Sequence, residues 1–478
     1  MRKIFKKSLI LFSAFTICFG TAIPKAQAVS SGVGSELDTY LSEAFEAANI
    51  PGAAVIISDD QNTLLSNTYG DCGGANEPFI IGSISKTFTA DAIMQLVEKG
   101  KVELDAPLSR YLKDSAEGQH ITIRQLLNHT SGIDTYMTLD NYSITSKQGT
   151  YVYANANYGL LGKVIEAVSG ISYGKYLEAN IFRPLGMEHT YTSLEEAKKD
   201  GLIAGYRNYF GFAVSQECDY PDKSSKGWLT IPAGYIISTA ADMNRYLKSY
   251  LNENVSILTS KSIASMFGET VPVAKGNSYG LGWGILDRDG TKIISHGGLV
   301  DNYTCQAFMI PKLKISGVIL MNSNDYFVGN AMTGDILLHV LDMLLGKTPT
   351  RVKGMGYVMS HILLDTLYLC LVLISLFPLL LIGIWRRKTH SKRRSILVFT
   401  LLHVLFPSVL LLIPVMLKVP MYVVARFAPD FFLIIVVSAA IAYLTGFLKI
   451  ALMLRIKKKI QAESKCSPIS EISIYKEI

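Results

Sequence analysis

The chain has 478 residues, 49% of them hydrophobic, so it is long enough for two or three domains with a large buried core. Its formal net charge of +7 is unevenly spread: residues 1–28 carry +5, residues 354–478 carry +10, and the segment between them carries −8. Because the basic excess lies at the two ends and the middle is mildly acidic, the charge argues against a nucleic-acid partner.

The first 28 residues predict a signal peptide. They have a basic start, an apolar stretch from Ser8 to Ala22 and a small-residue exit at Ala26-Gln27-Ala28, which is the pattern of secretory signals. An uncleaved anchor is the alternative, but the apolar stretch is short for a membrane span. We therefore expect an exported domain to follow.

The predicted exported domain, residues 29–350, has strands at both ends and helices between them. A helix-like stretch from Glu36 to Ala48 precedes two β-rich runs within residues 52–70, and later strands fall within residues 282–298 and 304–322. Between these ends the apolar residues recur mostly at helical spacing. The pattern predicts an α/β (α+β) fold, in which an antiparallel sheet is flanked by helices and carries an inserted all-helical subdomain.

A Ser-x-x-Lys pattern opens the first long helix of this domain. Ser83 and Lys86 are one helical turn apart, so an amine there can reach the hydroxyl, and the N-terminus of the helix favours an anionic oxygen. The same spacing recurs at Ser172 and Lys175. That second copy lies between two helices, where we expect a loop or an N-cap.

Two further patterns support the first copy. Tyr-x-Asn occurs three times, and only Tyr153 and Asn155 lie in a polar loop before a helix; residues two apart in an extended segment point to one side. His296, Gly297 and Gly298 continue a β-rich run, and glycine inside a strand often marks close approach by a ligand or another backbone. A helix start and a turn are the structural alternatives for these motifs taken singly.

The C-terminal third predicts three transmembrane helices. Each of three apolar runs is long enough to cross a bilayer, and three in a row with charged loops are hard to bury as core helices. The predicted segments are a linker at 351–365, spans at 366–384, 396–417 and 431–453, and a cytoplasmic tail at 454–478.

The loop charges predict the orientation of these spans. Basic runs at Arg386–Arg394 and Arg455–Lys459 follow the first and third spans, which favours the cytoplasmic side for both. Residues 29 to about 353 are then expected outside, in agreement with the signal peptide. We therefore expect a multi-pass plasma-membrane protein whose catalytic domain is extracytoplasmic, with the lipid bilayer as a partner.

The spacing of the cysteines and histidines matches neither a metal-binding motif nor a set of several disulfides. Three cysteines, Cys72, Cys218 and Cys305, fall in the exported segment at wide spacings, so one bridge is possible and the pair stays open. No HxxxH or CxxC pattern accompanies the histidines, so we expect no metal site and no cofactor.

The order Ser-x-x-Lys, Tyr-x-Asn, His-x-Gly resembles the serine β-lactamase and penicillin-binding-protein superfamily, in particular its class C-like branch. The resemblance runs from about residue 35 to 345 and includes the segments "ITIRQLLNHTSGI", "YANANYGLLGKVIEAVSG" and "AGYIISTAADM". It implies an acyl-enzyme serine hydrolase that acts on a peptide containing a D-residue, such as wall stem peptide, a peptide antibiotic or a prodrug.

The resemblance also implies a role for each motif residue. Ser83 would be the acylated nucleophile and Lys86 its base, while Tyr153 would carry a proton to the leaving group and help to activate water. Substrate-binding residues would be Asn155, which would bind the substrate amide, and His296, Gly297, Gly298 and Leu299 on the strand; the amides of Ser83 and Leu299 would form the oxyanion hole.

His296 is a departure from the better-known pattern. Many β-lactamases and carboxypeptidases of the family have a lysine there, whose charge holds a substrate carboxylate, whereas a histidine is only partly charged near neutral pH. The departure favours a peptidase or an esterase over an efficient β-lactamase. Alternatives are a carboxylesterase or weak β-lactamase with the same residues, and a catalytically silent, penicillin-recognising membrane sensor.

Overall fold

The computed structural model describes residues 32–115, 117–221, 227–252, 256–348, 354–387 and 392–466. Its contacts divide the chain into two compact units, Met1–His361 and Ile362–Ile478. The predicted signal peptide at 1–28 and the end of the predicted tail, residues 467–478, lie outside the described residues.

An eight-stranded antiparallel sheet forms the centre of the first unit, in the order β2-β1-β12-β11-β10-β9-β8-β7. The first strands pair with the last, so that Val55 of β1 lies opposite Ile319 of β12. This confirms the predicted sheet that joins the two ends of the domain. The strands are β1 Gly52–Ser58, β2 Thr63–Gly70, β7 Val271–Ala274, β8 Asn277–Tyr279, β9 Gly284–Arg288, β10 Thr291–Leu299, β11 Thr304–Ile310 and β12 Ile315–Met321.

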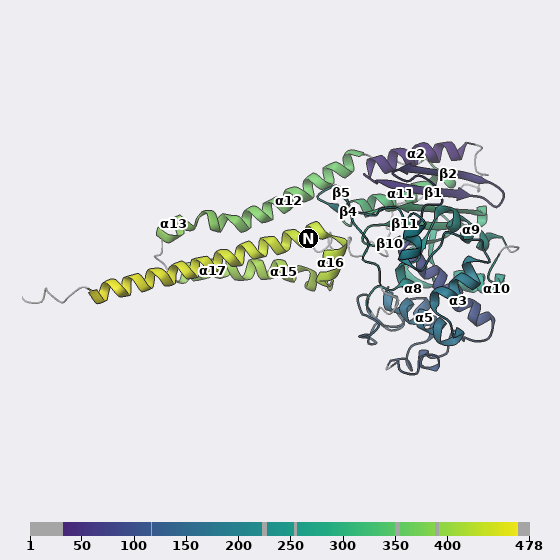
Figure 1. Ribbon diagram of the computed structural model, residues 1–478, viewed down its shortest axis with the longest axis horizontal. Helices are drawn as coiled ribbons and strands as arrows, with labels where there is room; N and C mark the ends of the chain where they lie inside the picture. Colours follow the sequence, from purple (N-terminus) through teal and green to yellow (C-terminus); the bar gives the residue numbers. More distant parts are fainter. Residues whose placement is uncertain are drawn as a thin grey trace, which may run out of the picture. The chain divides into compact units, whose positions relative to one another are not determined.

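The two faces of the sheet bury different cores. Helices α2 (Val33–Ala47) and α11 (Gly329–Leu344) cover one face, and the helical subdomain covers the other (Figure 1). Side chains alternate between the two faces along each strand, so on β10 Ile293 packs with α2 and α11 while Ile294 packs with the subdomain. By the same alternation, His296 and Gly298 face the helical subdomain.

The inserted subdomain contains the helices expected between the strands. Two small sheets, β3-β6 and β13-β4-β5, accompany the large sheet. Their strands are β3 Phe79–Ile80, β4 Tyr206–Tyr209, β5 Phe212–Ser215, β6 Ile237–Ser238 and β13 Ser323–Asn324. Its helices are α3 Ser85–Glu98, α4 Ile123–Leu127, α5 Asn155–Ser169, α6 Tyr173–Leu177, α7 Leu194–Lys199, α8 Ile231–Gly234, α9 Ala240–Leu251 and α10 Ser260–Gly268.

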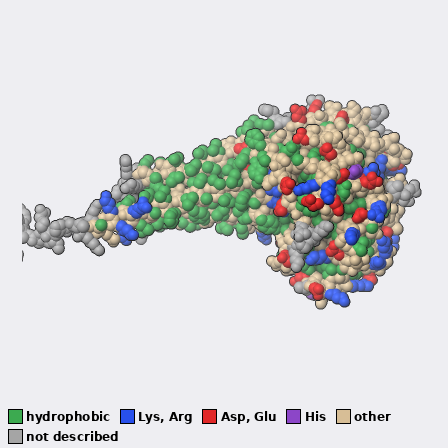
Figure 2. All heavy atoms as spheres, viewed as in Figure 1, with side chains coloured by type: hydrophobic (Ala, Val, Ile, Leu, Met, Phe, Trp, Pro, Cys, Tyr) green, Lys and Arg blue, Asp and Glu red, His purple; other side chains and the backbone are tan. Residues whose placement is uncertain are grey.

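The second unit contains the apolar helices. Three helical segments are long and apolar enough to cross a membrane, at Gly356–Trp385, Ile396–Met416 and Pro429–Lys459, which agrees with the three predicted apolar segments. On the face that Figure 2 shows, their side chains are mostly hydrophobic, and Lys and Arg side chains gather at one end. The helices are α12 Gly354–Leu380, α13 Ile382–Arg387, α14 Lys392–Thr400, α15 Phe406–Met416, α16 Met421–Phe427 and α17 Pro429–Cys466.

The segment expected as a linker at 351–365 is helical from Gly354 onward, so α12 begins before the apolar core of the first span. Residues 351–353 lie outside the described residues. The early start of α12 brings its first two turns into the first compact unit, which extends to His361.

Candidate active site

Ser83 lies in a tight turn between β3 and α3. The turn is a 3-10 helix, Gly82–Ile84, and Gly82 has a φ of +57°, a conformation that glycine adopts without steric cost. The hydroxyl of Ser85 donates to the Gly82 carbonyl at 2.7 Å and accepts from the Ile236 amide at 2.9 Å. These bonds fix the Ser83 turn against the segment that follows α8.

Lys86 is completely buried beneath this turn and contacts three oxygens. Its Nζ lies 2.9 Å from the Ser83 Oγ, 2.8 Å from the Asn155 Oδ1 and 2.5 Å from the Ala233 carbonyl oxygen. The structure therefore brings Ser83, Lys86 and Asn155 together. Ala233, on α8, is a partner that the sequence motifs did not identify.

The three partners determine what the amine does in each protonation state. An ammonium donates three hydrogen bonds, one to each oxygen. A neutral amine has two N–H donors and one lone pair, and the oxygens of Asn155 and Ala233 can only accept. The lone pair must then face the Ser83 hydroxyl, which is the one partner able to donate. The amine can thus take the Ser83 proton without moving.

Burial lowers the pKa of Lys86 well below its ordinary value of 10.5. The cause is desolvation, which disfavours the charged form of a buried amine. A buried lysine with uncharged oxygen partners is the condition that a lysine base requires.

Tyr153 lies beside both Ser83 and Lys86. Its ring centroid lies 4.8 Å from the Lys86 Nζ. Burial raises the pKa of the Tyr153 phenol, and a hydrogen bond with Ser83 opposes part of that rise. The phenol is therefore protonated at neutral pH and available as a donor. Ala154 is extended, and Asn155 is the first residue of α5, so the Tyr-x-Asn motif turns from loop into helix at the site.

His129 supports the loop that carries Tyr153. The sequence motifs did not identify this histidine as part of the site. Its Nδ1 accepts from the Ala154 amide at 3.2 Å and lies 3.1 Å from the Asn157 Nδ2, so its proton is on Nε2. The His129 ring lies 4.4 Å from the Tyr153 ring, centroid to centroid. The signal available in the sequence was a polar run, Asn128 to Ser131, directly after the apolar Leu126-Leu127.

The end of β10 touches the serine turn through backbone atoms. A Cβ at Gly82 would lie 2.3 Å from the Leu299 nitrogen, and a Cβ at Gly298 would lie 1.9 Å from the Ile81 carbonyl oxygen. Only residues without a Cβ permit this approach. The Leu299 amide therefore lies beside the Ser83 turn, as an oxyanion hole shared by the two segments would require.

His296 is neutral rather than partly charged. Its Nε2 lies 3.0 Å from the Tyr279 hydroxyl and its Nδ1 lies 2.7 Å from the Gly297 carbonyl oxygen. Burial, with a smaller effect of the nearby Lys86, lowers the pKa of His296 to about 3. The expectation of partial charge near neutral pH is thus wrong for this histidine, because its ring is desolvated.

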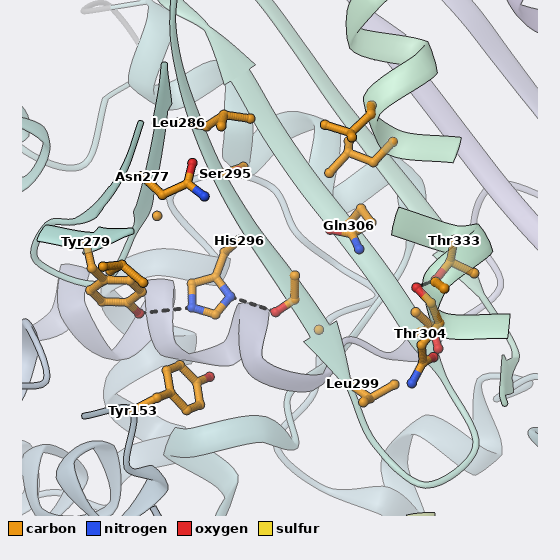
Figure 3. A pocket seen from close by; sticks show the side chains of 18 of the residues that line it. Tyr153, Asn277, Tyr279, Leu286, Ser295, His296, Leu299, Thr304, Gln306 and Thr333 are labelled. Carbon is orange, nitrogen blue, oxygen red and sulfur yellow. Dashed lines mark hydrogen bonds between the residues drawn. The ribbon is translucent and has the colours of Figure 1, made fainter. Parts of the chain in front are cut away.

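A cavity of about 270 Å³ adjoins these residues (Figure 3). Tyr153, Tyr279, His296 and Leu299 line it beside the serine turn, and it continues between β10 and α11. Figure 3 shows the imidazole of His296 between the Tyr279 hydroxyl and the backbone of β10. The side chains that line the cavity in the described part of the chain include no Asp, Glu, Lys or Arg.

The three cysteines among the described residues of the first unit are all thiols. Cys72 and Cys305 are buried, and Cys218 is half-buried and donates to the Asp301 Oδ1 at 3.2 Å. The bridge that the sequence left open is therefore not formed. Among the described residues, no group of three or more His, Cys, Asp or Glu side chains is arranged to hold a metal ion.

Comparison with known proteins places this site in context. A family model described as "Beta-lactamase" matches residues 37–340. "Protein flp" of Staphylococcus aureus (strain NCTC 8325 / PS 47) is 27% identical over 330 residues, which are 61% of this chain and 64% of that protein. "Penicillin-binding protein 4" of Amycolatopsis lactamdurans is 25% identical over 338 residues, covering 62% of this chain and 87% of that protein.

Solved structures give the same picture. The octameric penicillin-binding protein homologue from Pyrococcus abyssi matches 68% of this chain and 80% of its own, with a TM-score of 0.59 and 29% identity. A class C beta-lactamase with 20% identity and a TM-score of 0.55, covering 66% of this chain and 96% of that chain, shares the fold. The matched region thus spans just under two thirds of the staphylococcal relative's length.

Proposed function

Since the chain belongs to the beta-lactamase family, we propose that it is a serine hydrolase that forms an acyl-enzyme on Ser83 and cleaves amide bonds in D-residue-containing peptides. The observation that carries the proposal is the contact of Lys86, whose pKa is lowered by complete burial, with the Ser83 hydroxyl. Lys86 accepts the serine proton as the Ser83 Oγ attacks the substrate carbonyl, and a tetrahedral oxyanion forms.

The oxyanion accepts hydrogen bonds from the amides of Ser83 and Leu299, which the glycine contact brings side by side. The intermediate collapses when the carbon–nitrogen bond breaks. Tyr153, protonated in the free enzyme, gives a proton to the leaving amine and regains one from the Lys86 ammonium. An ester between Ser83 and the acyl group remains.

Deacylation reverses these roles. A water molecule loses its proton to the Tyr153–Lys86 pair and attacks the carbonyl of the Ser83 ester. The pair then returns that proton to the Ser83 Oγ as the ester C–O bond breaks and the acid leaves. Asn155 donates from its amide nitrogen to the substrate, since its Oδ1 is held by Lys86.

The cavity narrows the substrate class. Recognition of a free C-terminal carboxylate usually requires a cation, and the cavity lining in the described residues has none, while His296 is neutral. An internal amide, as in an aminopeptidase, amidase or endopeptidase substrate, suits this wall better than the carboxylate of a β-lactam or of a DD-carboxypeptidase substrate.

The proposed place of action is the outer face of the plasma membrane. The signal-like start, the basic loops after the first and third spans and the three apolar helices support this topology. Protease digestion of intact cells tests it, because an extracytoplasmic catalytic domain is degraded and a cytoplasmic one is protected.

Covalent labelling tests the nucleophile. The full-length protein is treated with a fluorescent penicillin and with a fluorophosphonate, beside Ser83→Ala and the matched control Ser172→Ala. We expect labelling of the parent and of Ser172→Ala and none of Ser83→Ala. Labelling that persists in Ser83→Ala would overturn the assignment.

Turnover separates the remaining functions. The enzyme is given p-nitrophenyl esters, D-amino-acid amides, and D-residue peptides with free and with amidated C-termini. We expect the amides and amidated peptides to be preferred. Preference for the esters indicates a carboxylesterase, and a stable adduct that is never hydrolysed indicates a penicillin-recognising sensor; either result contradicts the proposed peptidase activity.

A further inference from the structure

The hairpin of β4 (Tyr206–Tyr209) and β5 (Phe212–Ser215) carries an unusual surface. Phe210 and Gly211 join the strands with φ angles of +56° and +83°, the left-handed pair of a two-residue hairpin turn. Directly after the turn, Phe212 is 74% exposed, and Val214 on the same side of β5 is 45% exposed.

This hairpin lacks the charges that protect an edge strand. β5 is at the edge of the three-stranded sheet, and exposed edges in water usually carry charged side chains. Within residues 205–216 the one charged residue is Arg207, which is buried and paired with Asp301. The exposed face is therefore apolar without the usual protection, which indicates contact with something other than water.

The hairpin turn lies against the first two turns of α12. The Asn208 Nδ2 donates to the Tyr357 hydroxyl at 2.7 Å. A Cβ at Gly211 would lie 3.3 Å from the His361 ring. The tip of the hairpin is thus level with residues 357–361.

That level corresponds to a membrane interface if α12 spans a bilayer. The 19 residues 366–384 cover about 28 Å at 1.5 Å per residue, which matches a hydrocarbon core of about 30 Å. His361 lies five residues earlier, about 7.5 Å outside that core, and each headgroup layer is about 5–8 Å thick. Aromatic side chains are enriched in this layer.

We propose that the β4–β5 tip, Phe212 with Val214, inserts into the lipid interface beside the start of α12. The catalytic unit then contacts the membrane at a second point in addition to its covalent link. The proposal rests on α12 crossing a bilayer, which its length and apolarity allow, and is independent of the reaction at Ser83.

The contact would also place one wall of the cavity near the bilayer surface. His361 bonds Asp325 at 2.8 Å through its Nε2. Tyr326 and Phe327, the next two residues, line the cavity.

Tryptophan quenching tests the proposal in the full-length protein. Phe212→Trp, Val214→Trp and the control Ile171→Trp, an exposed apolar site at 41% on the helical subdomain, are each made in a Trp385→Phe background and reconstituted in vesicles with lipids brominated near the headgroup. The emission of the two remaining native tryptophans, Trp228 and Trp283, is measured in the Trp385→Phe protein and subtracted. We expect blue-shifted, strongly quenched emission from residue 212, a smaller effect at 214 and none at 171.

The native protein provides the insertion control. Trp385 lies at the end of the first candidate span, so the difference in quenching between the parent and Trp385→Phe reports that this span is in the bilayer. If Trp385 is quenched while residues 212 and 214 behave as residue 171 does, the hairpin does not enter the interface and the proposal is wrong. Two hairpin positions keep the test valid if one variant fails to fold.

Discussion

Two segments of this chain have the same Ser-x-x-Lys spacing and different chemistry. Ser83 lies in a buried 3-10 turn, and Lys86 is completely buried with three oxygen partners. Ser172 precedes the short helix α6, and both it and Lys175 are exposed. The spacing alone therefore carries no function; burial of the amine and the direction of its partners distinguish the two copies.

The helices that follow explain the difference in burial. Every residue of α3 from Ser85 to Leu96 is buried, so its lysine cannot reach water. Helix α6 has five residues and buries one side, which leaves Lys175 in solvent. An amine in water stays protonated at neutral pH and cannot act as a base.

We expect the largest difference between the two Ser-x-x-Lys copies when the lysine of each is replaced in turn. Lys86→Arg keeps a cation that does not deprotonate, so we expect the rate of Ser83 acylation to fall by about 10²–10⁴-fold, the usual contribution of a general base. Lys175→Arg should leave the rate unchanged. Stopped-flow measurement of the acylation burst with a p-nitrophenyl ester gives both rates.

A folding control accompanies this pair, because arginine is larger than lysine and the site is tightly enclosed. Lys86→Met has a similar volume and no base, and should lose acylation equally while its circular dichroism matches the parent. Equal rates in Lys86→Met and the parent would show that another group takes the Ser83 proton.

The fold was predictable because its signals are local. Residues 52–70 contain two β-rich runs with a polar turn between them, and they form β1 and β2. The helix-like stretch Glu36–Ala48 corresponds to α2, Val33–Ala47. The pairing of early with late strands followed from the presence of strands at both ends, since an antiparallel sheet is the simplest way to bury them together.

The site was predictable only in part, because some of its contacts do not depend on which residue types the sequence has at those positions. Lys86 bonds the Ala233 carbonyl, which every residue type possesses. The role of Gly298 depends on its distance from Ile81, more than two hundred positions away in sequence. The charge state of His296 follows from desolvation, which requires the packed structure.

Two neighbouring glycines on β10 allow a controlled test of the backbone contact between β10 and the Ser83 turn. A methyl group at Gly298 would lie 1.9 Å from the Ile81 carbonyl oxygen, whereas one at Gly297 would meet the movable amide of Gln306 at 3.2 Å. Gly298→Ala should separate the Leu299 amide from the Ser83 turn and lower kcat by about 10²–10³-fold, as loss of an oxyanion donor does. Gly297→Ala should cost far less, and similar losses in both variants would contradict the assignment of the Leu299 amide.

The pH profile tests the burial difference directly. Acylation requires neutral Lys86, and its lowered pKa means that the neutral form persists to a lower pH than it does for a lysine in water. We expect kcat/KM for an uncharged ester to fall tenfold per unit on the acid side and to level off well below pH 10.5. A rate that still rises up to pH 10.5 would mean that Lys86 titrates as an exposed lysine does.

His296 adds a second expectation to that profile. Because its pKa lies at about 3, it is neutral throughout the range from pH 5 to 8 and should contribute no inflection there. His296→Gln should therefore change the height of the profile and not its shape.

We expect the smallest effect from a substitution that removes one hydrogen-bond partner of His296 while the imidazole remains buried. Tyr279→Phe deletes the hydroxyl 3.0 Å from the His296 Nε2 and leaves the aromatic ring in place. A hydrogen bond of this kind contributes about 0.5–1.5 kcal/mol, so we expect kcat/KM for a D-amino-acid amide to fall about 2- to 12-fold. If orientation of a neutral imidazole is the role of Tyr279, the loss appears mainly in KM and the acid limb set by Lys86 stays where it is. A shift of that limb in Tyr279→Phe would show instead that the tyrosine controls the protonation of the base, and burial would no longer be a sufficient account of why Lys86 differs from Lys175.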